Sequence, residues 1–403
     1  MPQYWFTLSV VILTAACGAG DHAPDTSYGV TTRDSAGITI VTSSRAATES
    51  PLAWRVPSEP RVTLGADPTD PAGQFHRIRG AAVLADGTLA VLDGATLELR
   101  LFNPDGTHRR TVGGAGDGPG EFRQPHLVPG RGSDAVVIYD RQRARLTAVA
   151  ADGQVMAVRT VDLPPRERNA ELLGLLPDGK LVFRRTVGYV GLPVGVWEAE
   201  SVAFVLVDSA GRAHTVASPV GRRMYYTEHD ELGQQGMLDV PFDIEPAAAA
   251  SARGLFLTMD ERADVHAYDA TGTLRRILRL SIPPRVRTPE LVAEYYRLYT
   301  PKGITPWYRE QQSRIPAPEV LPLIDRLVVD DLGLLWARRY DVDPADQGLW
   351  FVFDPEGACQ GTVRLPAHLE VEQIGADFVL GIRRDAFDVE QVDLYDLQRE
   401  PAI

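Results

Sequence analysis

The chain has 403 residues and a formal net charge of -13, with 36 glycines and 30 prolines. So many turn-forming residues disfavour a mostly helical protein. The length allows either two or three ordinary domains or one large all-β domain. An acidic surface repels polyanions, so nucleic acid is excluded as an expected partner.

The first residues have the pattern of an export signal. The apolar run from Trp5 to Ala16 is too short to span a bilayer, and small residues then lead to Cys17, as at a cleavage site. The stretch LTAAC resembles the lipobox of bacterial lipoproteins, although the leader lacks Lys and Arg and its Leu stands one place early. The resemblance implies a signal peptide over 1–17 with lipidation at Cys17. An ordinary cleaved signal and a misassigned start remain open.

A polar segment follows, and we expect residues 18–36 to be a flexible tether. The only membrane contact would then be the acyl chains. Gly18 after the cysteine is compatible with the periplasmic side of the outer membrane, by resemblance to known sorting patterns, and simple export is the alternative. With Cys17 lipidated, Cys359 is alone, so neither an internal disulfide nor a cysteine metal site is expected.

From residue 60 onward the chain predicts short strands in repeated units. Alternating or apolar runs are joined by turn signals such as Asp-Gly, and the same pair of turns recurs. The distance from first to second turn is 19 residues from Gly87 to Gly106 and 18 from Gly254 to Gly272. Six such copies predict an all-β, six-bladed β-propeller over 37–399.

The sixth copy ends after its third strand. Residues 60–66 (PRVTLGA) match the missing fourth strand, so we expect the N-terminal strand to close the last blade. Residues 37–43 (GITIVTS) are expected to add a further outer strand.

The glycine-rich stretch 111–125 (TVGGAGDGPGEFRQP) does not have the spacing of a dinucleotide fingerprint, nor the Gly-Lys-Ser/Thr of a P-loop. We expect it to cross from one blade to the next, with glycines at positive φ and Phe122 filling the gap between the blades. The stretch resembles the linker of NHL-type propeller repeats.

A wider pattern supports the same fold. The segments RDSAGITIVTS, FHRIRGAAVLADGTLAVLDGATLELRLFNPDGTHRRTVGGAGDGPGEF and DDLGLLWARRY resemble a largely uncharacterised family of bacterial six-bladed propeller lipoproteins. The resemblance covers almost all of the chain after the tether. It implies the fold and little about activity, because propellers host many unrelated functions.

Four insertions are expected on one face of the propeller, around blades three to five: 187–200, 221–240, 282–320 and 341–348. Long loops on a rigid scaffold are common binding sites, and neutral surface elaboration is the alternative. Within 282–320, Thr288 and Pro289 predict the start of a short helix between blades four and five. The candidate partner-binding residues on these loops are Tyr225, His229, Trp307 and Tyr308, with packing as the alternative for the aromatic ones.

The starts of the innermost strands should line the central channel on this face. Aligning the copies gives six candidate ligand-binding residues at the channel mouth: Arg79, His126, Glu171, Glu245, Asp325 and Glu372. Such a mixture of acids and bases could bind a polar ligand. Equally, the groups could be solvated and paired with one another.

Two functions remain open. The first is a tethered, monomeric binding module of the cell envelope that recognises an envelope protein, a polar small ligand or a glycan, without catalytic residues or a cofactor. The second is a metal-dependent hydrolase or lyase, since six-bladed hydrolases of the lactonase and phosphotriesterase type hold calcium in this channel. Calcium takes six to eight oxygens, and Arg79 and His126 in the ring disfavour it, so we expect no metal site. The motif G-x-S-x-G is absent.

Overall fold

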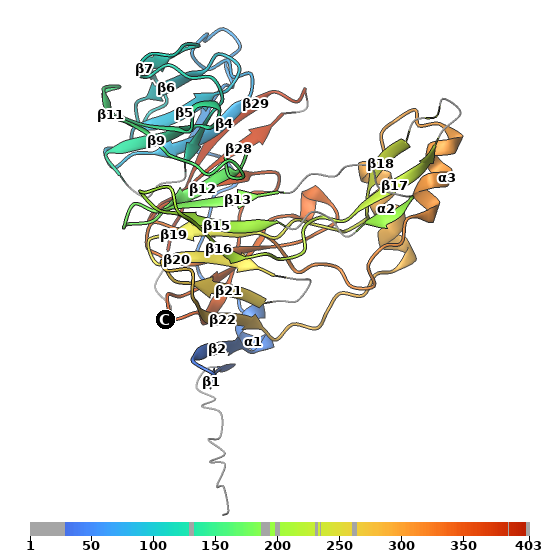
Figure 1. Cartoon of the computed structure of the whole chain (residues 1–403). Coiled ribbons are helices and arrows are strands. Elements are labelled where there is room, and N and C mark those ends of the chain that lie inside the picture. Colours follow the sequence, from blue (N-terminus) through green and yellow to red (C-terminus); the bar gives the residue numbers. More distant parts are fainter. Residues whose placement is uncertain are drawn as a thin grey trace, which may run out of the picture.

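The structure, a computed structural model, describes residues 29–128, 133–186, 194–197, 202–229, 233, 235–259, 264–385 and 387–399. The predicted signal peptide, Cys17 and most of the predicted tether lie outside these residues. Within them, six sheets surround one axis and form a six-bladed β-propeller, as predicted (Figure 1). The innermost strands contact one another in the closed order β4, β8, β12, β19, β23, β27 and back to β4.

The first three blades each have four antiparallel strands. Blade one comprises β4 (Ile78–Val83), β5 (Leu89–Asp93), β6 (Glu98–Phe102) and β7 (His108–Gly113). Blade two comprises β8 (Pro125–Val128), β9 (Ala135–Asp140), β10 (Arg145–Ala150) and β11 (Val155–Thr160). Blade three comprises β12 (Glu171–Leu175), β13 (Leu181–Arg185), β15 (Ala203–Val207) and β16 (Ala213–Ala217).

Among the other three blades, four and six also take strands from the N-terminal residues. Blade four comprises β19 (Ala248–Ser251), β20 (Gly254–Thr258), β21 (Asp264–Tyr268) and β22 (Leu274–Leu280), extended by β2 (Ile38–Ser43) and β1 (Val30–Ser35). Blade five comprises β23 (Ile324–Val329), β24 (Leu335–Arg339), β25 (Leu349–Phe353) and β26 (Cys359–Arg364). Blade six comprises β27 (Glu370–Ile374), β28 (Phe378–Arg384), β29 (Glu390–Asp396) and β3 (Val62–Leu64).

The closing strand is the one predicted from residues 60–66. β3 pairs antiparallel with β29, and Thr63 Oγ1 donates to Asp393 Oδ1 at 2.7 Å. The predicted outer strand also forms, because β2 pairs in parallel with β22. Between β2 and β3 lie the short helix α1 (Arg45–Glu49) and a bridge from Pro51 to Thr362 of blade five.

One boundary of the predicted tether was wrong. Residues 30–35 form β1, which pairs with β2. The strand is polar and mostly exposed, so it is held by backbone hydrogen bonds and lacks the apolar alternation that marks a half-buried strand.

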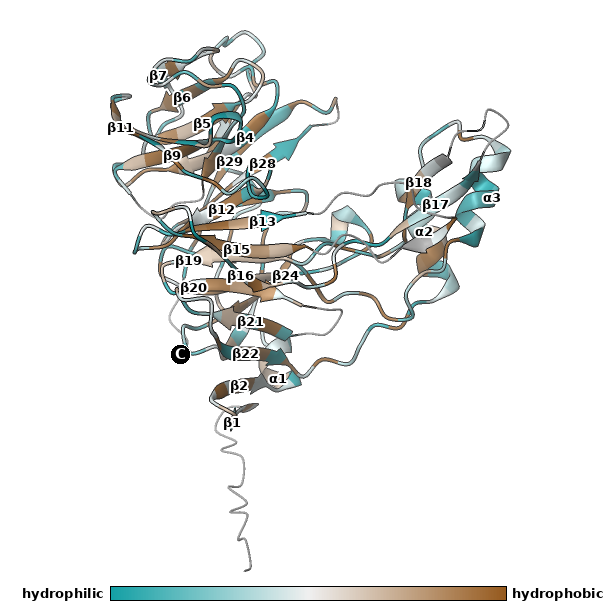
Figure 2. Ribbon diagram, in the orientation of Figure 1, coloured by the Kyte–Doolittle hydropathy of each residue, from teal (hydrophilic) through white to brown (hydrophobic). Residues whose placement is uncertain are grey.

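The core lies between the blades. Each pair of neighbouring blades shares an apolar cluster, including the clusters of blades one and two and of blades five and six. Figure 2 shows the apolar residues concentrated along the blade strands. Phe122 is 0% exposed in the cluster of blades one and two, so it fills the gap between them as predicted.

Gly113 allows this close passage. Its φ is +105°, and a Cβ there would lie 2.9 Å from Phe122 Cε2 and 3.0 Å from the Leu97 carbonyl oxygen. The glycines of this stretch therefore serve the backbone.

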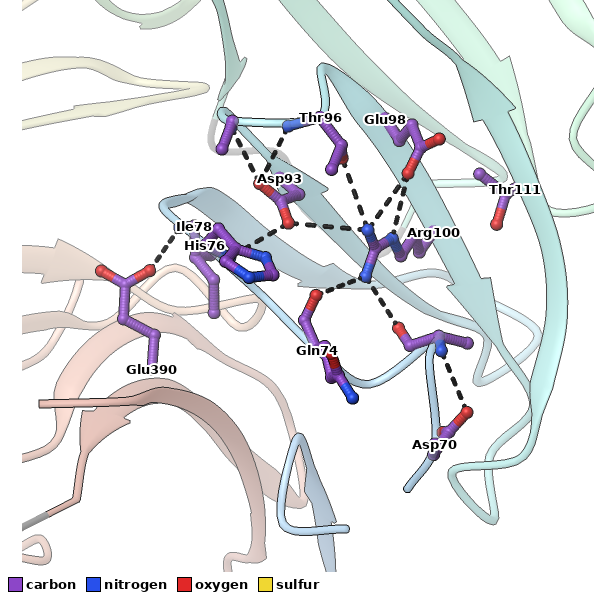
Figure 3. Close-up of polar contacts among 12 residues, drawn as sticks. Asp70, Gln74, His76, Ile78, Asp93, Thr96, Glu98, Arg100, Thr111 and Glu390 are labelled. Carbon is purple, nitrogen blue, oxygen red and sulfur yellow. Dashed lines mark hydrogen bonds and ion pairs between the residues drawn. The ribbon is translucent and has the colours of Figure 1, made fainter. Parts of the chain in front are cut away.

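A buried aspartate and arginine tie the entry of blade one to its strands (Figure 3). Asp93, 0% exposed at the end of β5, accepts the backbone N–H groups of His76 and Ala95. Arg100 on β6 lies 3.6 Å from Asp93 and donates to the carbonyl oxygens of Ala72 and Gln74 at 3.1 and 2.7 Å. Buried backbone N–H and C=O groups need hydrogen-bond partners. Asp93 and Arg100 supply these partners for the segment that leads into blade one.

Blade two repeats the arrangement at the glycine-rich crossing. Asp140, at the end of β9, accepts the N–H groups of Arg123 and Gln124. Arg145 on β10 donates to the carbonyl oxygens of Asp117 and Glu121. Blades one and two therefore share a buried aspartate–arginine arrangement as well as the apolar pattern of their strands.

Three of the four predicted insertions contribute to one accessory lobe on one side of the propeller (Figure 1), and the fourth, 341–348, contains only the 3-10 turn Pro344–Asp346. We define this lobe by β14 (Gly195–Trp197), β17 (Met224–His229), β18 (Gln235–Asp239), α2 (Pro289–Tyr299) and α3 (Pro306–Arg314). Its three strands form a separate sheet in the order β14-β17-β18. Among the described residues α2 and α3 are the longest helices, and neither has the length and apolarity that a bilayer span needs.

The helical insertion begins as predicted. The Thr288 hydroxyl accepts the Leu291 N–H as N-cap of α2, and Pro289 occupies the first turn. Leu291, Tyr295 and Leu298 pack against a buried cluster that includes Phe242 and Tyr340. The helix is therefore fixed to the propeller through its apolar face.

Replacing Arg100 with methionine should destabilise the fold by about 3 kcal/mol, because Asp93 would be left as a buried, uncompensated charge. Arg45→Met removes an exposed pair with Glu49 and should change stability by less than about 0.5 kcal/mol. Urea denaturation followed by tryptophan fluorescence measures both. Equal midpoints for the two variants would contradict the structural role of the buried pair.

Candidate functional site

All six residues predicted at the channel mouth line one cavity. It has a volume of about 1050 Å³ and extends along the starts of the innermost strands. Arg222 and Asp243, from the crossing between blades three and four, line it too. These two residues flank β17 and β18, so the cavity wall continues into the crossing that carries the accessory lobe.

β-Bulges place three of these side chains. The pairing register shifts between Ile78 and Ala81 in blade one, between Ile324 and Arg326 in blade five, and between Val371 and Gln373 in blade six. Arg79, Asp325 and Glu372 lie within these irregularities. A bulge redirects a side chain out of the regular alternation, which explains why charged residues occur in otherwise buried strands.

Gly80 makes the first bulge possible. Its φ is +123°, and a Cβ there would lie 2.7 Å from Leu127 Cβ on the neighbouring blade. Any other residue would combine backbone strain with a steric clash. The close contact between β4 and β8 therefore fixes the position of Arg79.

Arginines bind most of the channel carboxylates. Arg184 on β13 contacts both Glu171, with Nε to Oε2 at 2.9 Å, and Glu245, with Nη1 to Oε2 at 2.8 Å. Arg338 on β24 donates two hydrogen bonds to Asp325, at 2.8 and 3.0 Å. These pairs hold their side chains in fixed positions, so the cavity wall presents preorganised polar groups.

Glu372 is the least compensated carboxyl of the predicted set. Arg326 Nη2 lies 3.7 Å from its Oε1, beyond hydrogen-bonding distance. Burial raises the pKa of Glu372 to about 7, and the repulsion of Glu370 adds to the effect while Arg326 opposes it. Burial also raises the pKa of Asp325, against the opposing effect of Arg338.

His126 is held between blades two and three. Its Nε2 lies 3.2 Å from the Leu172 carbonyl oxygen, and its ring packs edge to face on Tyr139. Burial lowers the pKa of His126. The ring is therefore neutral at neutral pH and donates through Nε2, since a carbonyl can only accept.

The carboxylates do not fit a calcium ring. Calcium takes six to eight oxygens, whereas Glu171, Glu245 and Asp325 each bind an arginine. Within the described ranges, no group of three or more His, Cys, Asp or Glu side chains is arranged to hold a metal ion.

The predicted partner-binding residues are partly buried in the lobe itself. Tyr225 is 6% exposed in a cluster with Leu238, Val240 and Ile315, and Tyr308 packs against this cluster. Tyr225 is therefore too buried to form a contact surface, because the separate loops fold onto one another. Tyr308 is half-buried, and its role in partner binding stays a prediction. Trp307 is half-buried, and the His229 side chain lies outside what the structure describes.

Sequence reasoning missed the arginines that neutralise the carboxylates. Arg184 and Arg338 lie at the ends of second strands, so their approach to the channel depends on pairing between strands. A usable signal was the recurrence of arginine at this position, in LVFRR and LWARR. Together, the fold and this cavity define a six-bladed propeller with a charged, largely ion-paired channel.

Comparison with known proteins agrees with the fold. No protein-family model and no curated protein matches the chain. A solved member of the DUF4221 family from Bacteroides vulgatus has a TM-score of 0.50 at 10% identity, covering 86% of this chain and 99% of that one. A candidate exported protein from Bacteroides fragilis has a TM-score of 0.45 at 11% identity, covering 90% and 99%.

A gluconolactonase from Xanthomonas campestris is also similar, with a TM-score of 0.39 at 16% identity over 81% of this chain and 87% of that one. At such identities the likeness establishes the propeller fold alone. The resemblance to NHL-type repeats and to propeller lipoproteins stays a prediction.

The Glu372→Gln variant should gain stability relative to wild type as the pH rises from about 4.5 to about 7, and should keep this gain in alkaline solution. The carboxyl has an ordinary pKa of 4.5 when unfolded and about 7 when folded, so its favourable contribution is present below 4.5 and is lost as pH rises through 7. At about pH 8 the variant should gain on the order of 2 kcal/mol. Thermal denaturation at several pH values measures this gain.

Glu356→Gln, at an exposed turn of blade five, is the matched control and should show no such dependence. If the stability of Glu372→Gln followed that of wild type across the whole pH range, the raised pKa of the Glu372 carboxyl would be contradicted.

Proposed function

We propose that the chain is a binding module of the cell envelope whose channel mouth takes a polar small ligand or glycan. The observation that carries the proposal is the cavity of about 1050 Å³, which is lined largely by ion-paired charged side chains and continues into the crossing that carries β17 and β18 of the accessory lobe. Ligand sites are concave and combine a rigid frame with a few fixed polar groups.

The ion pairs favour this ligand class. Arg184 retains guanidinium donors beside two carboxylates, and each carboxylate has further lone pairs. Sugar hydroxyls both donate and accept, so they can bind such a wall without leaving a buried charge unpaired. An apolar ligand would bury these groups without compensation, which is costly.

The envelope location rests on the N-terminal sequence. The apolar run and LTAAC stretch before Cys17 support export followed by lipid anchoring, with the periplasmic side of the outer membrane as the proposed address. The fold similarity to a candidate exported protein is compatible with this proposal and adds no independent argument.

The structure gives less support for partner recognition by the lobe than the sequence did. Tyr225 and Tyr308 are used for packing within the lobe. The lobe is therefore proposed to shape the channel mouth and to limit access to it, rather than to present an aromatic contact surface.

Isothermal titration calorimetry with a sugar panel tests the proposal. The panel contains glucose, N-acetylglucosamine, maltotriose, glucuronate and glucose 1-phosphate. At least one should bind wild type, and Arg184→Gln should weaken binding about tenfold, because it removes charge-assisted donors and leaves Glu171 and Glu245 unpaired. Arg212→Gln, at a side chain 82% exposed on a turn of blade three, should bind as wild type does.

The proposal is wrong if no panel member binds at about 10 mM, where even weak specific sites are detectable. It is also wrong if Arg184→Gln and Arg212→Gln bind equally well. A protein partner on the lobe would then be the better hypothesis.

A hydrolase or lyase remains the second candidate, because Glu372 has a raised pKa near 7 inside the channel. Such a carboxyl can exchange protons at neutral pH, and strongly shifted groups concentrate at active sites. It would act as a general acid or base on a ligand bound beside it.

Metal analysis of the dialysed protein tests the metal-dependent version of this candidate. We expect no stoichiometric calcium, because arginines already bind the carboxylates. About one equivalent of calcium that resists dialysis and is lost in Asp325→Asn would favour the enzyme over the binding module.

A further inference from the structure

Two arginines at the channel mouth differ from the others in having no carboxylate partner. Arg184 and Arg326 each contact two glutamates, and Arg384 contacts Glu390 and Asp388. Across the part of the chain that the structure describes, Arg79 has neither a hydrogen bond nor an ion pair. The Arg141 guanidinium donates only to the Gln124 side-chain oxygen, at 3.1 Å.

These two arginines lie on the same part of the cavity wall. Arg79 lies in the bulge of β4, and Arg141 follows β9 in the short 3-10 turn Arg141–Arg143. Both lie close enough to the His126 ring to lower its pKa, in addition to the larger effect of burial. The neutral ring of His126 adds no competing charge between them.

Arg141 also joins the channel to a second cavity. This cavity has a volume of about 600 Å³ and lies where the crossing from blade two to blade three passes the end of β9. Arg168, an exposed residue without an ion pair in the described ranges, lines it together with Asn169 and the acidic Asp162. The second cavity therefore adds arginine side chains beside the channel, with one carboxylate among them.

An unpaired guanidinium in a concave site is a strong anion ligand. Arginine stays protonated at any physiological pH, and its planar fork matches the two oxygens of a carboxylate or phosphate. The chain has an excess of carboxylates, with a net charge of -13. The carboxylates near the channel pair with its other arginines and not with Arg79 or Arg141. Among the channel arginines in the described ranges, those without a carboxylate partner therefore lie at the corner formed by blades one and two.

We propose that Arg79 and Arg141 form an oxyanion subsite that binds a carboxylate or phosphate group of the ligand, with Arg168 adding a further positive side chain in the second cavity. The inference rests on the proposed function and narrows it to acidic ligands such as sugar acids or sugar phosphates. The uncharged part of the ligand would occupy the ion-paired remainder of the channel.

The test compares matched ligands that differ by one charged group. Calorimetry at constant ionic strength measures glucose, glucuronate and glucose 1-phosphate against wild type, Arg79→Gln and Arg141→Gln. Wild type should bind at least one acidic sugar about tenfold more tightly than glucose, and each variant should lose about tenfold for the acidic sugar alone. The acidic sugar that responds identifies the group as carboxylate or phosphate.

The control is Arg275→Gln, which changes net charge equally at an exposed side chain paired with Asp269 on blade four. It should bind all three sugars as wild type does. Flotation with phosphatidylcholine vesicles, with and without phosphatidylglycerol, separates a lipid headgroup from a soluble ligand as the source of the phosphate. Flotation that depends on phosphatidylglycerol and is lost in both channel variants would assign the subsite to a headgroup.

Three results would overturn the subsite. Equal affinity for glucose and the acidic sugars, unchanged in Arg79→Gln and Arg141→Gln, would remove the subsite and leave the proposed function intact. An equal loss of affinity for the acidic sugar in the channel variants and in Arg275→Gln would show that the loss comes from the change in net charge alone. No binding of any sugar or vesicle by wild type would contradict both the subsite and the proposed function.

Discussion

Closure of the ring by β3 and β29 is the constraint on which the rest of the molecule depends. Only three residue pairs join the two strands, but Asp393, 0% exposed, reinforces them by accepting from Thr63 and from Arg383. Without this pairing, blade six would expose an edge strand and the inner strands would lose their common axis. The channel is a product of closure, because its wall takes one strand from each blade.

Closure also explains the chemistry of the wall. Six inner strands converge on a narrow axis, and bulges at Arg79, Asp325 and Glu372 turn side chains towards it. Charges brought so close must be compensated, and arginines on second strands supply the compensation for Glu171, Glu245 and Asp325. Compensation is weakest at Glu372, which lies 3.7 Å from Arg326, and at Arg79 and Arg141. These groups are the best candidates for binding or catalysis, because a ligand can form new ion pairs or hydrogen bonds with them. Side chains already in ion pairs gain less interaction energy from a ligand.

The repeat was predictable from sequence because each blade has its own turn signals and apolar runs, and the six channel positions followed from aligning them. The closing strand β3 was also predicted, from the strand missing in the sixth copy, but contacts among the inserted loops were not predictable. Two insertions assemble the sheet β14-β17-β18, and Ile315 from a third segment helps to bury Tyr225, which local periodicity cannot indicate. β1 was missed because its exposed strand has no apolar face. The bulges were missed because a register shift depends on the partner strand, although Gly80 beside Arg79 was a visible hint.

The position of β1 has a consequence for how the molecule would sit at a membrane. β1 is the outermost strand of blade four, whereas β19 of the same blade reaches the axis. If Cys17 is lipidated as the sequence predicts, the anchored segment would therefore join the propeller at its rim, beside the outermost strand of blade four. The mouth of the channel would then lie away from the point of attachment.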